Sequence, residues 1–228
     1  MAVSGLKNRI EKNLAPSLII RLSEVDAPMR LAARAKRARG QRGSVELFFA
    51  FDDASSAYAL ISLAELVNQR DVDLIPRPVV DRGIPDDPAV DRKRSYAIDD
   101  AVRLFARGGT ELVRRTPIDP EATAWLAQWV ADAPQSAALT DFTVEAVRLL
   151  WLTDGQQPDR ERFERLWSEK LGGSPPAVGD GLASNELRMA RLRMYETPAA
   201  WVTGRWFFAH ERVAQIGEWL DRLGWEES

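Results

Sequence analysis

The chain has 228 residues, of which 45% are hydrophobic and 29% are charged, a composition typical of one soluble globular domain or of one domain with extensions. Its net charge of −3 gives no overall attraction to nucleic acid or to an anionic membrane. The absence of cysteine excludes thiol catalysis, disulfides and thiolate metal sites, and a single histidine, His210, argues against a zinc site built from protein ligands.

Residues 1–43 are expected to form a helical extension. Leu6, Ile10 and Leu14 repeat at four-residue spacing, and a second amphipathic stretch follows Pro16. The early apolar runs fall far short of the roughly 20 residues that a membrane span needs, and no signal peptide is evident. We therefore expect no transmembrane segment and a cytoplasmic location.

The second part of this extension is basic. No acidic residue lies between Asp26 and Glu46. The same stretch contains six cations: Arg30, Arg34, Lys36, Arg37, Arg39 and Arg42. Such a run is typical of a solvated helix face, and a surface for phosphate or membrane is the alternative.

The main domain is predicted to begin with a βαβ unit. Val45–Phe51 is a continuous apolar run of strand length, which indicates a buried strand. The polar residues 52–56 have helix N-cap chemistry, and the helix that follows carries an apolar face. That face consists of Leu60, Leu63, Leu66 and Val67. Val72–Ile75 is predicted to be a second strand, stopped by Pro76 and Pro78.

From about residue 92 to 193 the pattern is helical, and a β-hairpin and a last helix follow. The helical stretches are Tyr96–Ala106, Glu121–Asp132, Thr140–Thr153, Arg160–Leu171 and Ala183–Met194. Tryptophans recur on their faces and are expected to line the core or a pocket, at positions 125, 129, 151 and 167. Ala199–Val202 and Trp206–Phe208 are predicted to pair around a turn at Gly204, and the last helix runs from His210 to about Leu223.

This order predicts an α/β, thioredoxin-like fold with a helical insertion between its βαβ and ββα halves. We expect residues 1–43 to be the basic extension and residues 44–223 to be the domain. Within the domain, residues 44–90 and 195–223 would form the thioredoxin core, and residues 91–194 the insertion.

Four segments carry a family resemblance, and they are Val45–Phe51, Arg77-Pro78, Thr197–Val202 and Phe207–Val213. Their order and spacing resemble those of DsbA, 2-hydroxychromene-2-carboxylate isomerases and kappa-class glutathione transferases, over roughly residues 44–223. The resemblance implies the thioredoxin superfamily, in a cysteine-free branch with a degenerate active loop. Such a protein is not a disulfide oxidoreductase, and the resemblance is to an isomerase or a glutathione transferase.

The alignment of the active loop depends on its register. A gap-free match places Asp53, Ala54, Ser55 and Ser56 on the family's Ser-Pro-Tyr-Ser, or on Cys-x-x-Cys in DsbA. A shift of two residues would place Ser55 on the catalytic serine, but it would misplace both the strand and the apolar helix face. We therefore adopt the gap-free match.

The resemblance makes Asp53, Ser55 and Ser56 the candidate catalytic residues. An ionised Asp53 would disfavour a nearby thiolate, so plain transferase chemistry is disfavoured. Asp53 could act as a general acid or base if burial raised its pKa. The alternative is that Asp53 caps the following helix and that Ser55 and Ser56 bond its backbone.

The resemblance also assigns glutathione binding to Thr197, Pro198, Glu211 and Arg212. Pro198 would be the family's cis-proline, facing the active loop. Glu211 and Arg212 match a pair that holds the γ-glutamyl end of glutathione, although they could equally be a solvated helix start. His210 is expected to be a surface or capping residue.

Two functions remain open. The first is a glutathione-assisted or acid-base isomerase of small aromatic or hydroxy-carbonyl compounds. The second is a non-catalytic thioredoxin-fold module for binding or assembly. The expected partners are a small-molecule substrate or glutathione, and a second copy in a homodimer. Neither a metal cofactor nor specific nucleic acid binding is expected.

Overall fold

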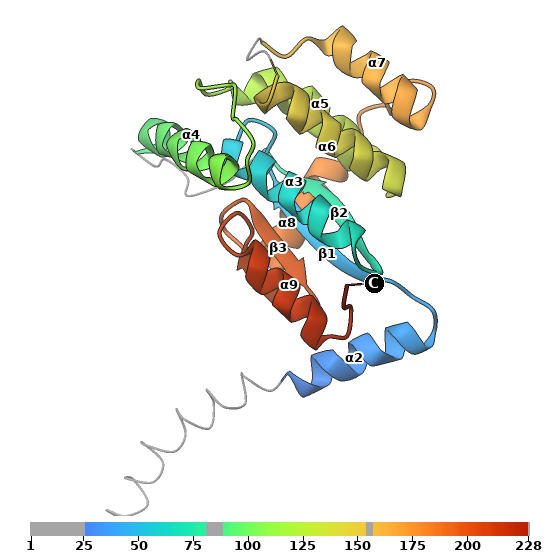
Figure 1. The fold of residues 1–228 in the computed structure, drawn as a ribbon. Coiled ribbons are helices and arrows are strands. Elements are labelled where there is room, and N and C mark those ends of the chain that lie inside the picture. The colour runs from blue at the N-terminus through green and yellow to red at the C-terminus, as the bar shows by residue number, and fades with distance from the viewer. Residues whose placement is uncertain (1–25, 81–88, 154–156, 228) are drawn as a thin grey trace, which may run out of the picture.

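The computed structural model describes residues 26–80, 89–153 and 157–227, and its centre is one four-stranded sheet (Figure 1). The strands lie in the order β2 (Val72–Pro78), β1 (Gly43–Phe49), β3 (Ala199–Val202) and β4 (Arg205–Phe208). β1 and β2 are parallel, whereas β1–β3 and β3–β4 are antiparallel. The predicted βαβ unit and the hairpin thus share one sheet, and the predicted α/β class is confirmed.

The described residues also form a set of helices, most of which come between the two halves of the sheet. They are α2 (Ala27–Ala38), α3 (Ala54–Asn68), α4 (Val90–Arg107), α5 (Pro120–Asp132), α6 (Ala137–Trp151), α7 (Arg160–Leu171), α8 (Gly181–Arg191) and α9 (Val213–Arg222). Helices α4 to α8 follow β2 and precede β3, which confirms the predicted helical insertion. The predicted bounds of α7 are correct, whereas α4 begins before the predicted Tyr96.

The N-terminal extension can be compared with the prediction only in part. Residues 1–25 lie outside the described residues, and α2 occupies most of the remainder. Two of the six predicted cations are engaged by the domain. Arg37 donates to the Gly224 carbonyl at 2.9 Å, and Arg42 forms an ion pair with Asp73 at 2.6 Å. These contacts fasten both ends of the connection between α2 and β1.

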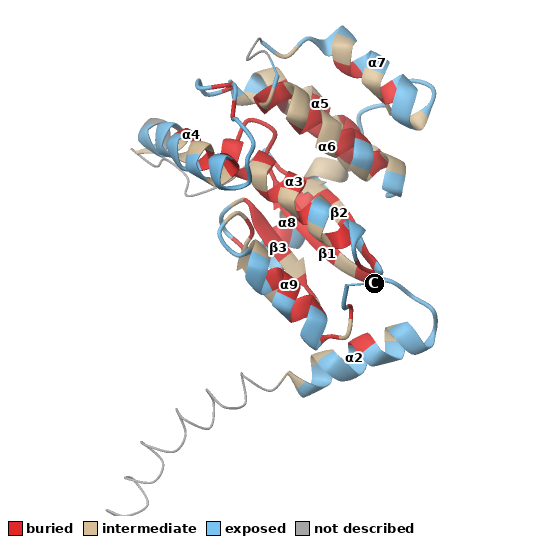
Figure 2. Ribbon diagram, viewed as in Figure 1, coloured by how far each residue is buried: buried red, intermediate tan, exposed pale blue. Residues whose placement is uncertain are grey.

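Side chains of β1 alternate between two packed faces, and six of its seven residues are buried (Figure 2). Val45, Leu47 and Phe49 are fully buried on the face covered by α3 and α9. Leu60 and Leu63 of α3 complete this core, as the predicted apolar helix face requires. A strand buried on both faces explains why the sequence shows a continuous apolar run instead of alternation.

The helical block is joined to the same core through its tryptophans, as predicted. Trp129, Trp151 and Trp167 are buried, and Trp125 is partly buried. The Trp151 indole N–H donates to the Phe51 carbonyl at 3.0 Å. This bond connects α6 to the loop that follows β1, so the helical insertion helps to hold that loop.

The other face of the sheet carries a smaller core with α8. Phe48, Val79, Met189 and Ala199 are the main members. Next to them, the buried carboxylate of Glu46 accepts hydrogen bonds from two arginines that come from other segments.

These bonds form a buried ion pair across the sheet. Arg77 Nε on β2 donates to Glu46 at 3.1 Å, and Arg188 Nε on α8 donates at 2.6 Å, with a second bond from Arg188 Nη2. Burial by itself raises the pKa of Glu46, but the hydrogen bond from Arg188 and the charges of both arginines outweigh it, so the pKa is lowered. α8 is therefore fastened to β1 by charge as well as by apolar contact.

The prediction that Pro76 and Pro78 stop the second strand was wrong. β2 continues through both prolines to residue 78. Because Val79 N donates to the Phe49 carbonyl, the odd-numbered residues of β2 face β1 and the even-numbered ones face the free edge. Both prolines therefore lack their N–H on the side where no strand is paired.

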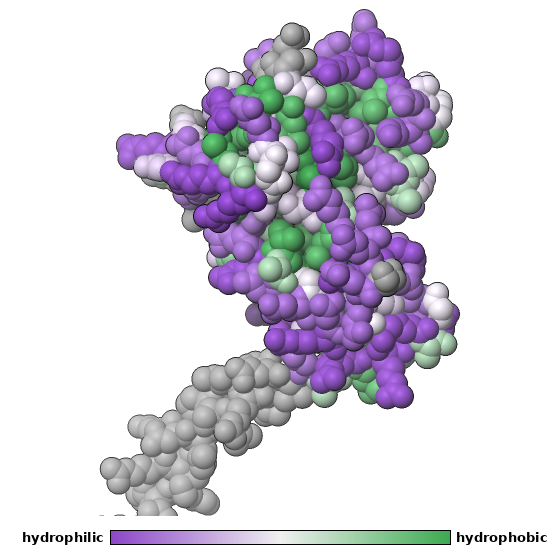
Figure 3. Space-filling view, viewed as in Figure 1, coloured by the Kyte–Doolittle hydropathy of each residue, from purple (hydrophilic) through white to green (hydrophobic). Residues whose placement is uncertain are grey.

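The face in Figure 3 is mostly hydrophilic, and its apolar areas are small and separate. Among the described residues, no helix combines the length and the apolar character needed to cross a membrane.

Candidate functional site

The predicted site residues gather at one end of the sheet. β1 ends there, and β3 begins there, because Phe48 pairs with Ala199 in antiparallel register. Ala199 in turn pairs with Phe208 at the end of β4, and Ala209 N donates to the Pro198 carbonyl at 2.9 Å. The loop after β1, the segment before β3 and the turn after β4 thus meet at the same end.

Asp53 is the N-cap of α3, which was one of the two roles predicted for it. Its backbone is extended, and its side chain accepts from Ser55 N at 3.3 Å and from Ser56 N at 3.0 Å. The polar residues Asp52, Asp53, Ser55 and Ser56 are all buried. The cap exists because the first N–H groups of a helix have no partner within the helix.

Ser56 closes a ring with Asp53. Its hydroxyl donates to Asp53 Oδ2 at 2.6 Å and accepts from Ala50 N at 3.2 Å. We call this arrangement the Asp53–Ser56 ring. The single hydroxyl proton of Ser56 is used inside the ring, so it is not directed at a ligand.

The peptide bond between Thr197 and Pro198 is cis, as predicted. Two polar atoms near it are buried without a hydrogen-bond partner, Thr197 Oγ1 and His210 Nδ1. The bond between residues 209 and 198 brings these two residues to the same end of the β3–β4 pair. The predicted hairpin already places these two residues at the same end, but the sequence pattern does not predict that Thr197 Oγ1 and His210 Nδ1 are buried without partners.

His210, Glu211 and Arg212 lie in a turn, so the prediction that the last helix begins at His210 was wrong. Glu211 N donates to the Phe208 carbonyl at 3.3 Å, and Arg212 has φ −121°. Both features end the strand and delay the helix until Val213. Glu211 and Arg212 are exposed, and His210 Nε2 lies 3.8 Å from the Glu211 carboxylate.

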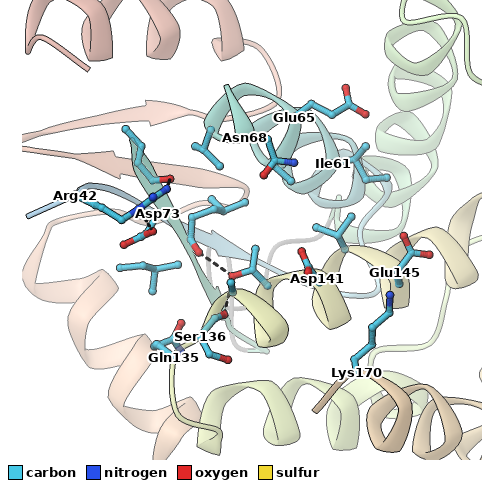
Figure 4. A pocket seen from close by; sticks show the side chains of 18 of the residues that line it. Arg42, Ile61, Glu65, Asn68, Asp73, Gln135, Ser136, Asp141, Glu145 and Lys170 are labelled. Carbon is cyan, nitrogen blue, oxygen red and sulfur yellow. Dashed lines mark hydrogen bonds and ion pairs between the residues drawn. The ribbon is translucent and has the colours of Figure 1, made fainter. Parts of the chain in front are cut away.

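A separate groove of about 520 Å³, which no sequence pattern predicted, lies beside β2, between α3 and α6 (Figure 4). Its floor includes Ile61, Val67, Leu74 and Val144. Figure 4 shows Arg42 and Asp73 at one end of its rim and Glu145 and Lys170 at the other.

Most charges on this rim are already paired. Arg42 pairs with Asp73, and Arg148 lies 3.5 Å from Glu65 and 3.8 Å from Glu145. Charges that are neutralised within the groove do not select a ligand of one sign. The end of the sheet therefore remains the better candidate for a functional site.

Within the described part of the chain, no group of three or more His, Asp or Glu side chains is placed to hold a metal ion. The candidate site offers the carboxylates of Asp53 and Glu211, the guanidinium of Arg212, several hydroxyls and the imidazole of His210. Hydrogen bonding and proton transfer are the chemistries that such groups can perform.

The parallel βαβ unit and the antiparallel hairpin, joined in one four-stranded sheet, define a thioredoxin-like fold, and the loop after β1 carries aspartate and serine. Among solved structures, the chain is similar to 2-hydroxychromene-2-carboxylate isomerase, at 18% identity over 79% of this chain and 96% of that one, with a TM-score of 0.62.

It is also similar to two structures of Proteus mirabilis ScsC. One is a linker-deletion mutant, at 13% identity over 98% of this chain and 97% of that one, with a TM-score of 0.47. The other shows a transitional conformation, at 12% identity over 97% and 93%, with a TM-score of 0.46. No protein-family model and no curated protein sequence matches the chain. At these identities the likeness concerns the fold.

Proposed function

We propose that this chain is a thioredoxin-fold binding protein that works without thiol–disulfide exchange, and that its site at the end of the sheet binds a small polar ligand. The observation that carries the proposal is the Asp53–Ser56 ring. It stands where the resemblance expects a serine that stabilises a glutathione thiolate. In this chain that position holds a carboxylate, and the nearby Ser56 proton is already donated to it.

The ring is better suited to fixing the loop than to chemistry. The Asp53 carboxylate is already used as the acceptor for two backbone N–H groups and for the Ser56 hydroxyl. A negative charge also disfavours a thiolate placed beside it. Disulfide exchange additionally needs an attacking thiolate, which a chain without cysteine does not supply.

The binding role is supported by the two polar atoms without partners. A buried donor or acceptor left unsatisfied costs about 1–3 kcal/mol, so a ligand group that pairs with Thr197 Oγ1 or His210 Nδ1 would gain that stabilisation. The two side chains lie beside the cis-proline, where this fold presents its backbone to ligands.

Calorimetric titration tests the proposal directly. The ligands are reduced glutathione, S-methyl glutathione and small aromatic acids, each titrated into the wild type and the variants Thr197→Val and Asp53→Ser. We expect binding that does not require a free thiol and that weakens in Thr197→Val. If no ligand produces a heat of binding at millimolar concentration, the proposed binding function is wrong.

A second candidate is an isomerase acting on small aromatic or hydroxy-carbonyl compounds. It is favoured by the cis-Pro198 next to an acid-bearing loop, and by the fold shared with 2-hydroxychromene-2-carboxylate isomerase. The test is conversion of 2-hydroxychromene-2-carboxylate with and without glutathione. Turnover that Asp53→Asn abolishes, while Ser55→Ala retains it, would favour the isomerase over the binding protein.

A further inference from the structure

The two edge strands of the sheet, β2 and β4, differ in how many of their outward backbone groups have hydrogen-bond partners. The outer edge of β2 has no N–H at Pro76 or Pro78. Three of its carbonyls accept from side chains of other segments: Val72 from Arg42, Leu74 from Thr140 and Pro78 from Asn185. This edge is closed to another strand, as natural sheets commonly arrange.

The outer edge of β4 has the opposite character. A two-residue turn with positive φ at Thr203 (38°) and Gly204 (86°) makes Val202 and Arg205 the closing pair of the hairpin. Such a pair is hydrogen-bonded, so by alternation the backbones of Trp206 and Phe208 point away from β3.

Three of the four outward backbone groups of Trp206 and Phe208 are open. The Phe208 carbonyl accepts from Glu211 N at 3.3 Å. The Trp206 N–H, the Trp206 carbonyl and the Phe208 N–H have no partner among the described residues. Unpaired donors and acceptors in this alternation are a template for one more β-strand.

Aromatic side chains flank the open edge. The ring of Trp206 lies 5.2 Å from Phe208 and 6.4 Å from Tyr195. Trp206 is 38% exposed and Tyr195 is 58% exposed. The edge thus combines open backbone groups with exposed apolar surface, which marks interaction sites on soluble domains.

We propose that the β4 edge binds the β4 edge of a second copy of this chain, antiparallel about a twofold axis, which joins two sheets into one. The open groups are self-complementary. In this arrangement Trp206 lies opposite Phe208 of the second copy, and each such pair exchanges two N–H···O=C bonds. The Phe208 carbonyl accepts the new bond on its second lone pair, because Glu211 N already donates to the first. The twofold axis repeats the pair, as an isologous interface requires.

The side chains and the charges of β4 are compatible with a second copy of the chain at this edge. Trp206 of one copy and Phe208 of the other become cross-strand neighbours on one face, and aromatic cross-strand pairs stabilise sheets. Arg205, the one charged residue of β4, already forms an ion pair with Asp26. Two copies therefore meet without opposing unpaired charges, which would disfavour self-association.

Analytical ultracentrifugation of the full chain tests this interface, over about 1 to 200 µM because the mass of a weak dimer depends on concentration. We expect a shift from one chain to two. Trp206→Pro should abolish the shift, since it removes an outward N–H without removing a bond of the β3–β4 ladder. Trp206→Phe, the matched control, keeps the N–H and an aromatic ring and should still dimerise.

Hydrogen exchange on the wild type supplies a readout that does not depend on a variant folding. The amides of Trp206 and Phe208 should become protected as concentration rises, whereas the N–H of Leu74 at the closed edge should not change. A chain that remains monomeric at the highest concentration would overturn the proposal. So would a dimer that leaves both β4 amides unprotected, or one that persists in a folded Trp206→Pro variant.

Discussion

The two faces of the sheet are closed by different physical means, although the same strand supplies both. On the face covered by α3 and α9, β1 contributes only apolar side chains, such as Leu47 and Phe49. On the face covered by α8, it contributes Phe48 together with Glu46 and its two arginines. The stability of the face covered by α3 and α9 depends on close packing of apolar side chains. The stability of the face covered by α8 depends in addition on the charge of Glu46, which is balanced by arginines of β2 and α8. Each face should therefore respond to a different kind of substitution.

The largest expected effect belongs to the apolar face. Leu63 is fully buried, so Leu63→Ala should lower the free energy of unfolding by about 2–5 kcal/mol, through lost burial and the cavity left behind. Urea denaturation measures this change. Leu187→Ala on α8, where the side chain is 52% exposed, is the control and should change stability by less than about 0.5 kcal/mol. Equal losses in the two variants would contradict the assignment of the core.

On the face with the ion pair, Glu46→Gln should lower the free energy of unfolding by about 1–3 kcal/mol. Removing one partner of a buried pair leaves its counter-charges uncompensated, but Arg77 and Arg188 are partly exposed, and water reduces the loss. Chemical denaturation again provides the measurement. Glu218→Gln, at an exposed position of α9, is the control, and a similar loss there would refute a special role for Glu46.

A smaller effect is expected where Asp53 caps α3. Asp53→Ala should cost about 0.5–2 kcal/mol, because two N–H groups and the Ser56 hydroxyl lose their acceptor. Ser55→Ala should be nearly neutral, since only the backbone of Ser55 contributes to the cap. Thermal unfolding of the two variants separates these outcomes. A neutral Asp53→Ala would show that the Asp53–Ser56 ring does not stabilise the loop.

The smallest expected effect is a pH dependence from Glu46. Its pKa in the native state lies below the ordinary 4.5, so the unfolded chain binds a proton at a higher pH than the native chain does. Stability from this group is therefore present above pH 4.5 and is lost as pH falls through the native pKa. Urea midpoints of the wild type and Glu46→Gln, measured from pH 3 to 7, should converge at acid pH. A constant difference would contradict the lowered pKa.

The fold was predictable where a local pattern carries it. The apolar run Val45–Phe51 identified β1, which lies two residues earlier, and the amphipathic stretch Arg160–Leu171 identified α7 with its bounds. The cis bond before Pro198 was expected from the family resemblance and not from a local pattern. The extent of β2 was not predictable, because a proline ends a strand only if its N–H side is paired. Whether Pro76 faces β1 or the free edge depends on register, and register is a property of the assembled sheet.

For the candidate site, the cap at Asp53 was one of two roles that could be predicted from the sequence, whereas the environment of Thr197 and His210 could not be predicted. The burial of their polar atoms depends on two turns meeting at one end of the sheet. The ion pair of Glu46 was hidden for a similar reason, because Arg188 lies 142 residues further along the chain. Ion pairs between residues so far apart in the chain produce no periodic pattern that a single sequence could reveal.

The pairing of Phe48 with Ala199 also has a consequence for synthesis of the chain on the ribosome. β1, α3 and β2 emerge first, followed by about 100 residues of helices, and α6 can dock on α3 and β2 before β3 exists. Throughout that interval one side of β1, an apolar central strand, has no neighbour. An unpaired strand of this kind favours association with other chains. The nascent protein is therefore most vulnerable to aggregation in the interval before β3 leaves the exit tunnel. Premature termination in that interval would release a fragment with an unpaired central strand, which would aggregate more readily than the folded domain.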